Sequence, residues 1–137
     1  MRKNHILALG TILMLAGLVL SACGGGPGTA ELTVDMVEFM FEPAQLSVPA
    51  NAQVTLNLSN SGSLEHEFVI MKMGEEVTAP VNEDVIEDQI FWEHELEAGE
   101  SETLQFQAPS EPGAYQIICA IAGHLEQGME GTLTVTQ

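Results

Sequence analysis

Apolar and polar side chains alternate along most of this chain, and this two-residue period limits the possible folds more than any other feature. Val54, Leu56 and Leu58 alternate in QVTLNLSN, as Leu133 and Val135 do in TLTVT. Such alternation predicts half-buried β-strands. Turn-forming sequences such as VPANA and SEPGAY separate the apolar runs. The pattern predicts an all-β fold, an antiparallel Greek-key sandwich of about seven or eight strands.

Residues 73–98 are the exception, because their apolar positions follow no steady period. We expect a short helical or irregular excursion there, with a helix capped by Asn82. Phe91 and Trp92 in this segment are expected to cover the core.

The N-terminus has the features of a signal for export. Arg2 and Lys3 precede the apolar run from Ile6 to Leu20, which is too short to span a membrane comfortably. The run ends in LSAC, which resembles the bacterial lipobox and makes Cys23 the expected site of lipid attachment. The alternative is an ordinary secretory signal followed by a chance cysteine. We therefore expect a signal peptide over residues 1–22.

The Gly-rich segment 23–30 is expected to be a flexible tether, followed by one domain over 31–137. This organisation predicts an exported protein that a lipid anchors on the extracytoplasmic side of a membrane. With Cys23 acylated, Cys119 is the only cysteine left in the domain. A single cysteine in an oxidising compartment is expected to be buried, reactive or bound to a metal.

The chain is strongly acidic, with a formal net charge of −17 at pH 7. Arg2 and Lys3 lie in the predicted signal, so Lys72 alone faces 20 acidic residues in the remainder. This charge argues against nucleic acid and anionic membrane surfaces as partners. It favours a basic protein partner or a salty environment, and the alternative is that it serves solubility alone.

Three residues with metal-binding side chains follow one another at five-residue steps: Cys119, His124 and Met129. A thiolate, an imidazole and a thioether form a soft set that suits copper or zinc and does not suit magnesium or calcium. Gly123 and Gly128 precede the His and the Met, where they allow a tight loop. Zinc seldom takes a Met ligand, whereas one Cys, two His and a weak axial Met are typical of blue copper.

Such a site needs a second histidine, and the domain offers His66 and His94. His66 begins the apolar run HEFVI directly after a turn, so a sandwich can bring it to the same end as the loop after Cys119. His94 lies between two glutamates in FWEHELEAG and is expected at the surface. We therefore favour His66 as the ligand and keep His94 as the alternative.

The sequence resembles the cupredoxins, the small blue copper proteins, over residues 31–135. The resemblance rests on EFMFEPAQLSVPANAQVTLNLSNSGSLEHEF and on EPGAYQIICAIAGHLEQGMEGTLTV. It implies a cupredoxin sandwich holding one type 1 copper ion through His66, Cys119, His124 and Met129. The loop spacing is most like that of auracyanins, sulfocyanins and rusticyanin. This sequence departs from the family pattern at Glu67, where many members have an Asn that ties the two ligand loops together. Without that Asn, the backbone amide of residue 67 is expected to hydrogen-bond the sulfur of Cys119.

These residues predict a one-electron carrier with no catalytic residues, because four protein ligands leave no evident position for a substrate. The ring of His124 would exchange electrons through an apolar rim, formed by Ala120, Ile121, Ala122 and Leu125. The expected partners are redox proteins, such as a basic cytochrome, met at a membrane surface.

Two other functions stay open. The first is copper handling for storage, delivery or resistance, supported by Met71 and Met73 in MKM, since paired Met side chains can hold Cu(I). The alternative is that both are core residues, which is more common for Met at this spacing on a strand. The second is a role as an accessory domain of a larger respiratory complex.

Overall fold

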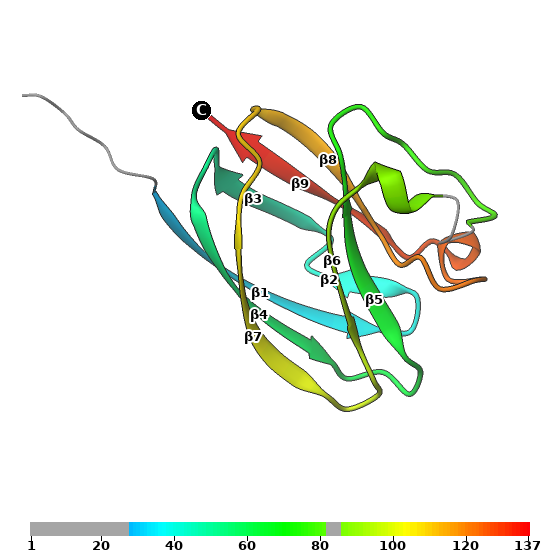
Figure 1. Ribbon diagram of the computed structural model, residues 1–137. Helices are drawn as coiled ribbons and strands as arrows, with labels where there is room; N and C mark the ends of the chain where they lie inside the picture. The colour runs from blue at the N-terminus through cyan, green and yellow to red at the C-terminus, as the bar shows by residue number, and fades with distance from the viewer. Residues whose placement is uncertain (1–27, 82–85) are drawn as a thin grey trace, which may run out of the picture.

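The computed structural model describes residues 28–81 and 86–137, which form two packed β-sheets (Figure 1). One sheet has the order β2-β1-β4-β7 and the other β3-β9-β8-β5-β6, so these residues contain nine strands. The all-β sandwich is thus confirmed, with a somewhat higher strand count than expected. The strands are β1 (Thr29–Val37), β2 (Met40–Glu42), β3 (Gln45–Pro49), β4 (Gln53–Asn60), β5 (His66–Met71), β6 (Ile90–Leu96), β7 (Ser101–Gln107), β8 (Gly113–Ile118) and β9 (Glu130–Thr136).

The burial of the strands follows the sequence pattern. In β4 every second side chain is buried, whereas all six residues of β5 are buried. The main core lies between the sheets, and a second cluster on the other side of β5 includes Val69, Met71 and Leu125. The run HEFVIM is continuously apolar after its first two residues because β5 is covered on both faces.

Two strand pairs are parallel, which corrects the expectation of an antiparallel sandwich. β1 pairs with β4, and β3 pairs with β9, in the same direction. The reason is the path of the chain: after β2 it crosses to the other sheet for β3 and then returns as β4 beside β1. Alternation shows which face of a strand is buried, but it does not show which strand lies beside it.

Within the predicted excursion, residues 90–96 form the regular strand β6, which is a correction. Trp92 packs against the core and stacks on Phe106 at a centroid distance of 4.8 Å, as expected. Phe91, by contrast, is exposed. A 3-10 helix, η1 (Glu87–Gln89), precedes the strand, whereas Asn82 lies outside the described residues.

The last two residues of the predicted tether 23–30 belong to a strand. β1 starts at Thr29, and the amide of Gln53 donates to the carbonyl of Gly28 (2.8 Å). The signal 1–22 and the acylation site Cys23 lie outside the described residues and remain predictions. In the part of the chain that the structure does describe, no helix has the length and hydropathy of a membrane span.

The start of β1 and the end of β9 lie at one end of the sandwich, and the candidate ligand segments lie at the other (Figure 1). The amide of Ala50 donates to the carbonyl of Thr136 (2.8 Å), which places the end of β9 beside the turn that leads into β4. The start of β1 lies at this same end, as Figure 1 shows in blue and red. The segment 119–129, drawn in orange, and the start of β5 lie at the opposite end.

Replacing Gly131 by Ala is expected to destabilise the protein. A Cβ on Gly131 would lie 2.5 Å from the carbonyl oxygen of Ala44, to which the amide of Thr132 donates (2.8 Å). Overpacking against backbone costs about 1–3 kcal/mol of unfolding free energy, which urea unfolding of the metal-free protein measures. The exposed control Thr134→Val on the same strand should stay within about 0.5 kcal/mol of the parent. An unchanged midpoint for Gly131→Ala would contradict this packing.

Candidate metal centre

The four candidate ligands come from two places in the chain that meet at one end of the sandwich. His66 is the first residue of β5, and Cys119 directly follows β8. His124 is the N-cap of the 3-10 helix η2 (Leu125–Gln127), and Met129 directly precedes β9. All four side chains are buried, and His124 is the most accessible of them at 8%.

Three donor atoms face one another in a tight group. The Nδ1 atoms of His66 and His124 are 3.2 Å apart, and the Sγ of Cys119 is 3.2 Å from the Nδ1 of His124. One ligand atom from each residue lies within 4.8 Å of the others. The side chains are therefore arranged so that one ion between them would meet all three.

The loop from Cys119 to Met129 is closed by its own backbone. The amide of Cys119 donates to the carbonyl of Met129, and the amide of Met129 donates to the carbonyl of His124, each at 3.1 Å. Gly128 ends η2 with φ 93°, a left-handed conformation that favours glycine. These bonds fix the spacing of Cys119, His124 and Met129 within the loop.

The pKa shifts of His66, His124 and Cys119 suit the binding of a soft cation. Burial lowers the pKa of His66, and the neighbouring His124 lowers it further. Burial also lowers the pKa of His124, so both rings favour the neutral form that binds metals. Burial raises the pKa of the Cys119 thiol, so we expect metal binding itself to displace its proton.

Glu67 stands where the sequence departs from the resembled pattern, and its backbone takes the role expected of it. The amide of Glu67 donates to the Sγ of Cys119 at 3.4 Å. This hydrogen bond lowers the pKa of the thiol, in opposition to burial. It links the strand that carries His66 to the residue after β8.

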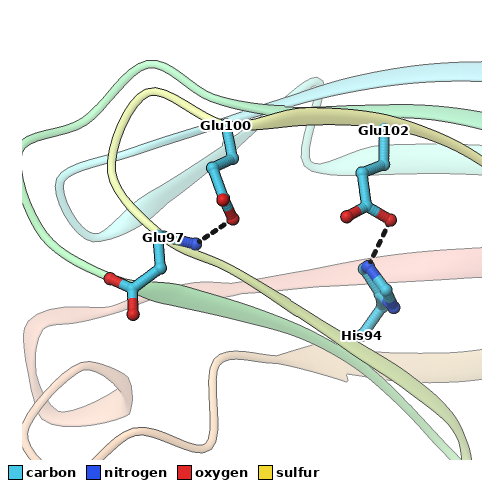
Figure 2. Close-up of polar contacts among 4 residues, drawn as sticks. All are labelled: His94, Glu97, Glu100 and Glu102. Atoms are coloured by element: carbon cyan, nitrogen blue, oxygen red, sulfur yellow. Dashed lines mark hydrogen bonds and ion pairs between the residues drawn. The ribbon is translucent and has the colours of Figure 1, made fainter.

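His94 lies away from this group, on β6. Its Nε2 is 3.0 Å from the Oε2 of Glu102 (Figure 2). Its ring stacks beside Trp92 with an interplanar angle of 21°. Its side chain is 30% exposed. Of the two histidines considered from the sequence, the structure places His66 beside Cys119 and His124.

The predicted docking rim is only partly at the surface. Ala122 is exposed and Ile121 is half-buried. Ala120 and Leu125 are buried at 3% and 7%, because both pack into the second hydrophobic cluster. They therefore cannot form part of an exposed rim, which corrects the expectation.

Sequence reasoning missed a residue that contacts His124. Phe39 lies at the turn between β1 and β2, and its ring meets that of His124 edge-on at a centroid distance of 5.3 Å. Met40, which directly follows Phe39, is 52% exposed. Leu64, two residues before His66, is 45% exposed. A positive φ at Phe39 marks this turn, but the sequence contains no glycine there to signal it.

Met71 and Met73 do not form the pair considered from the sequence. Met71 is fully buried in the second cluster, whereas Met73 is half-buried and packs against the main core. The strand β5 ends at Met71, so the two-residue period that would place both on one face stops there.

The donor set fits a copper ion. Two imidazoles and a thiol face one another, and the buried thioether of Met129 follows His124 by five residues, a soft combination. Oxygen ligands, which magnesium and calcium require, are not part of the group.

Comparisons with known proteins point the same way. Residues 10–135 match the family model of the cupredoxin-like domain. The chain is 36% identical over 123 residues to auracyanin-B of Chloroflexus aurantiacus, and 28% identical over 120 residues to the copper-resistant cuproprotein CopI of Rubrivivax gelatinosus. These alignments cover 79% and 81% of this chain, and 52% and 70% of those proteins, so the chain spans about half the length of auracyanin-B.

The fold also resembles solved structures. The crystal structure of reduced auracyanin from Roseiflexus castenholzii superimposes with a TM-score of 0.68 at 29% identity, covering 82% of this chain and all of that one. A structure of auracyanin B superimposes with a TM-score of 0.67 at 31% identity, covering 82% and 93% of the two chains.

Proposed function

The chain belongs to the cupredoxin-like family, and from this we propose that it is a blue copper protein that carries single electrons. His66, Cys119, His124 and Met129 would hold one copper ion. The observation that carries the proposal is the group of three donor atoms within 4.8 Å in a buried site. The similarity to auracyanins supports the same function.

The protein's own residues would keep the two redox states close in geometry. Copper supplies a reversible change between its cuprous and cupric states. His66 is held by β5, and the other three ligands are held by the hydrogen-bonded loop between β8 and β9. Ligands fixed in this way move little when the charge changes, which lowers the reorganisation cost. A cavity of about 760 Å³ beside β8 and β9 is lined by none of the four ligands.

A visible absorption spectrum tests the proposal. The copper-loaded protein should show an intense band in the visible region that disappears after the uptake of one electron per chain. A colourless protein that binds copper only as Cu(I) would overturn the electron-carrier function and favour copper handling.

Replacing Met129 by Leu should keep the copper and raise the reduction potential. The Met129 thioether would stabilise the more highly charged cupric state of a bound copper ion, and leucine fills a similar volume without a donor atom. Equilibrium redox titration measures the shift, with Met36→Leu, buried in the main core, as the matched control. Complete loss of copper from Met129→Leu would show that Met129 is a strong ligand.

The docking surface would surround His124, built from Ile121, Ala122, Phe39, Met40 and Leu64, and its occupant would be a basic redox protein such as a cytochrome. The net charge of −17 supports this choice of partner.

We expect the rate of electron exchange with a basic cytochrome to fall as salt is added, in stopped-flow measurements. A rate independent of salt would remove the electrostatic part of the proposal.

The lipid anchor at Cys23 would place the protein on the extracytoplasmic side of a membrane. One acyl chain alone binds reversibly. Membrane fractionation of Cys23→Ser tests this, since the variant should move to the soluble fraction.

Copper handling is the second candidate, and the similarity to CopI favours it. Copper affinity separates the two functions, because a delivery protein must transfer its ion to an acceptor whereas a carrier retains it through many cycles. Retention of copper during repeated oxidation and reduction would support the carrier.

A further inference from the structure

The side chain of Asn60 is buried at the end of β4, beside the loop 61–65 that leads into His66. Only 1% of its surface is exposed. Its Nδ2 donates to the carbonyls of Leu64 (2.8 Å) and Leu96 (2.9 Å), and its Oδ1 accepts from the amide of Gly62 (3.0 Å). Both amide protons and the oxygen are therefore used, as a buried amide requires.

These bonds join the two sheets at the level of His66. Leu96, the last residue of β6, is the register partner of His66 across the β5–β6 pair. Asn60 belongs to the other sheet, and its backbone also pairs with the turn after β6. Its amide donates to the carbonyl of Glu100 (2.9 Å), and its carbonyl accepts from the amide of Gly99 (2.8 Å). That turn is itself closed by a bond from the amide of Glu97 to the carboxylate of Glu100 (Figure 2).

The loop held by Asn60 lies directly against the ring of His66. A Cβ placed on Gly62 would be 3.2 Å from the Nε2 of His66 and 3.2 Å from the Oδ1 of Asn60. The backbone at Gly62 is thus packed between the two side chains. If this loop shifted, it would either push against the His66 ring or leave that ring free to move.

Two carboxylates hold the same loop from its outer side. Asp35 accepts from the amide of Ser61 (3.2 Å), and Glu38 accepts from the hydroxyl of Ser63 (2.7 Å). Both carboxylates belong to β1 and the turn after it. They are at or near the surface, so Asn60 is the buried member of the set.

We propose that Asn60 is a positioning residue for His66: it fixes the distance of the His66 ring from Cys119 and His124 before any metal is bound. The inference rests on the proposed role of His66 as a copper ligand. A purely structural Asn60 would contribute to stability and leave the metal site unchanged once the protein had folded, whereas a positioning residue changes the site itself.

The experiment compares Asn60→Ala and Asn60→Ser with two controls. Asn57→Ala removes an amide on the same strand that also makes two side-chain hydrogen bonds, to Glu31 (3.0 Å) and Thr103 (2.9 Å), away from the site. Val54→Ala removes buried volume at the opposite end of β4 and so lowers stability without touching the loop. The measurements are amide hydrogen exchange in the metal-free proteins, and the visible and electron paramagnetic resonance spectra and copper affinity of the loaded ones.

Asn60→Ala should speed amide exchange in residues 61–65, alter the copper spectra, and weaken copper binding by about 10- to 100-fold, the loss typical when contacts that orient a metal ligand are removed. Asn60→Ser should show a smaller change in spectra and affinity, because the serine hydroxyl can replace part of the three side-chain hydrogen bonds of Asn60. If the Ala variant does not fold, the Ser variant is used for the same measurements. Neither control should change the spectra. Copper spectra and affinity in both Asn60 variants equal to the parent would overturn the inference, while a parent without an intense band would overturn the proposed function instead.

Discussion

Replacing Cys119 by Ser should abolish the intense visible absorption of the copper-loaded protein. Cys119 supplies the only thiol of the three-residue group, and its Sγ lies 3.2 Å from the Nδ1 of His124. The intense band of such a site needs a soft, easily oxidised thiolate, whereas a serine oxygen is a hard donor that stays protonated near neutral pH. Serine has nearly the shape of cysteine, so the exchange of sulfur for oxygen changes the packing of this fully buried position little.

The matched control for this prediction is Cys23→Ser, which removes the other cysteine of the chain. It should keep the full absorption, because Cys23 is expected to carry lipid and not metal. Far-ultraviolet circular dichroism checks that both variants are folded. An unchanged visible band in Cys119→Ser would mean that the copper is bound elsewhere.

Replacing His66 by Ala should weaken copper binding by more than the roughly 100-fold that the loss of an outer contact can cause. The variant removes one of three donor atoms and leaves a cavity where the buried ring stood. Competition with a chelator of known affinity measures the loss.

His94→Ala is the control for His66→Ala, since His94 was the other candidate. It lies on β6 beside Glu102 and apart from the three donor atoms. Its copper affinity should equal that of the parent. A larger loss in His94→Ala than in His66→Ala would overturn the assignment of the ligand.

The candidate metal site could be predicted from the sequence because its residues are rare and regularly spaced. Cys119 has no cysteine partner in the domain, and His124 and Met129 follow it at equal steps. Only the second histidine needed a choice, and the position of His66 at the start of an apolar run pointed to it. The structure brings it to the other two.

The features that were missed depend on contacts between distant residues. Ala120 and Leu125 are buried by a cluster that includes Val77 and Ile86, from a segment without periodicity. Asn60 contacts the carbonyl of Leu96, 36 residues away, and nothing in NLSN distinguishes it from an exposed asparagine. Phe39 meets His124 only because β1 and β2 bring their turn to the same end.

The distance between the C-terminal end of β9 and the candidate metal centre also means that the domain would insulate one from the other. β9 runs from beside Met129 to the C-terminal end over seven residues, a length of about 24 Å at the usual rise per residue. A protein attached to an electrode through Gln137 would present its metal centre to the solution and hold it too far from the electrode for fast direct exchange. Attachment through Ala122 would reverse this, so the point of attachment decides whether the molecule conducts to the surface or only to dissolved partners.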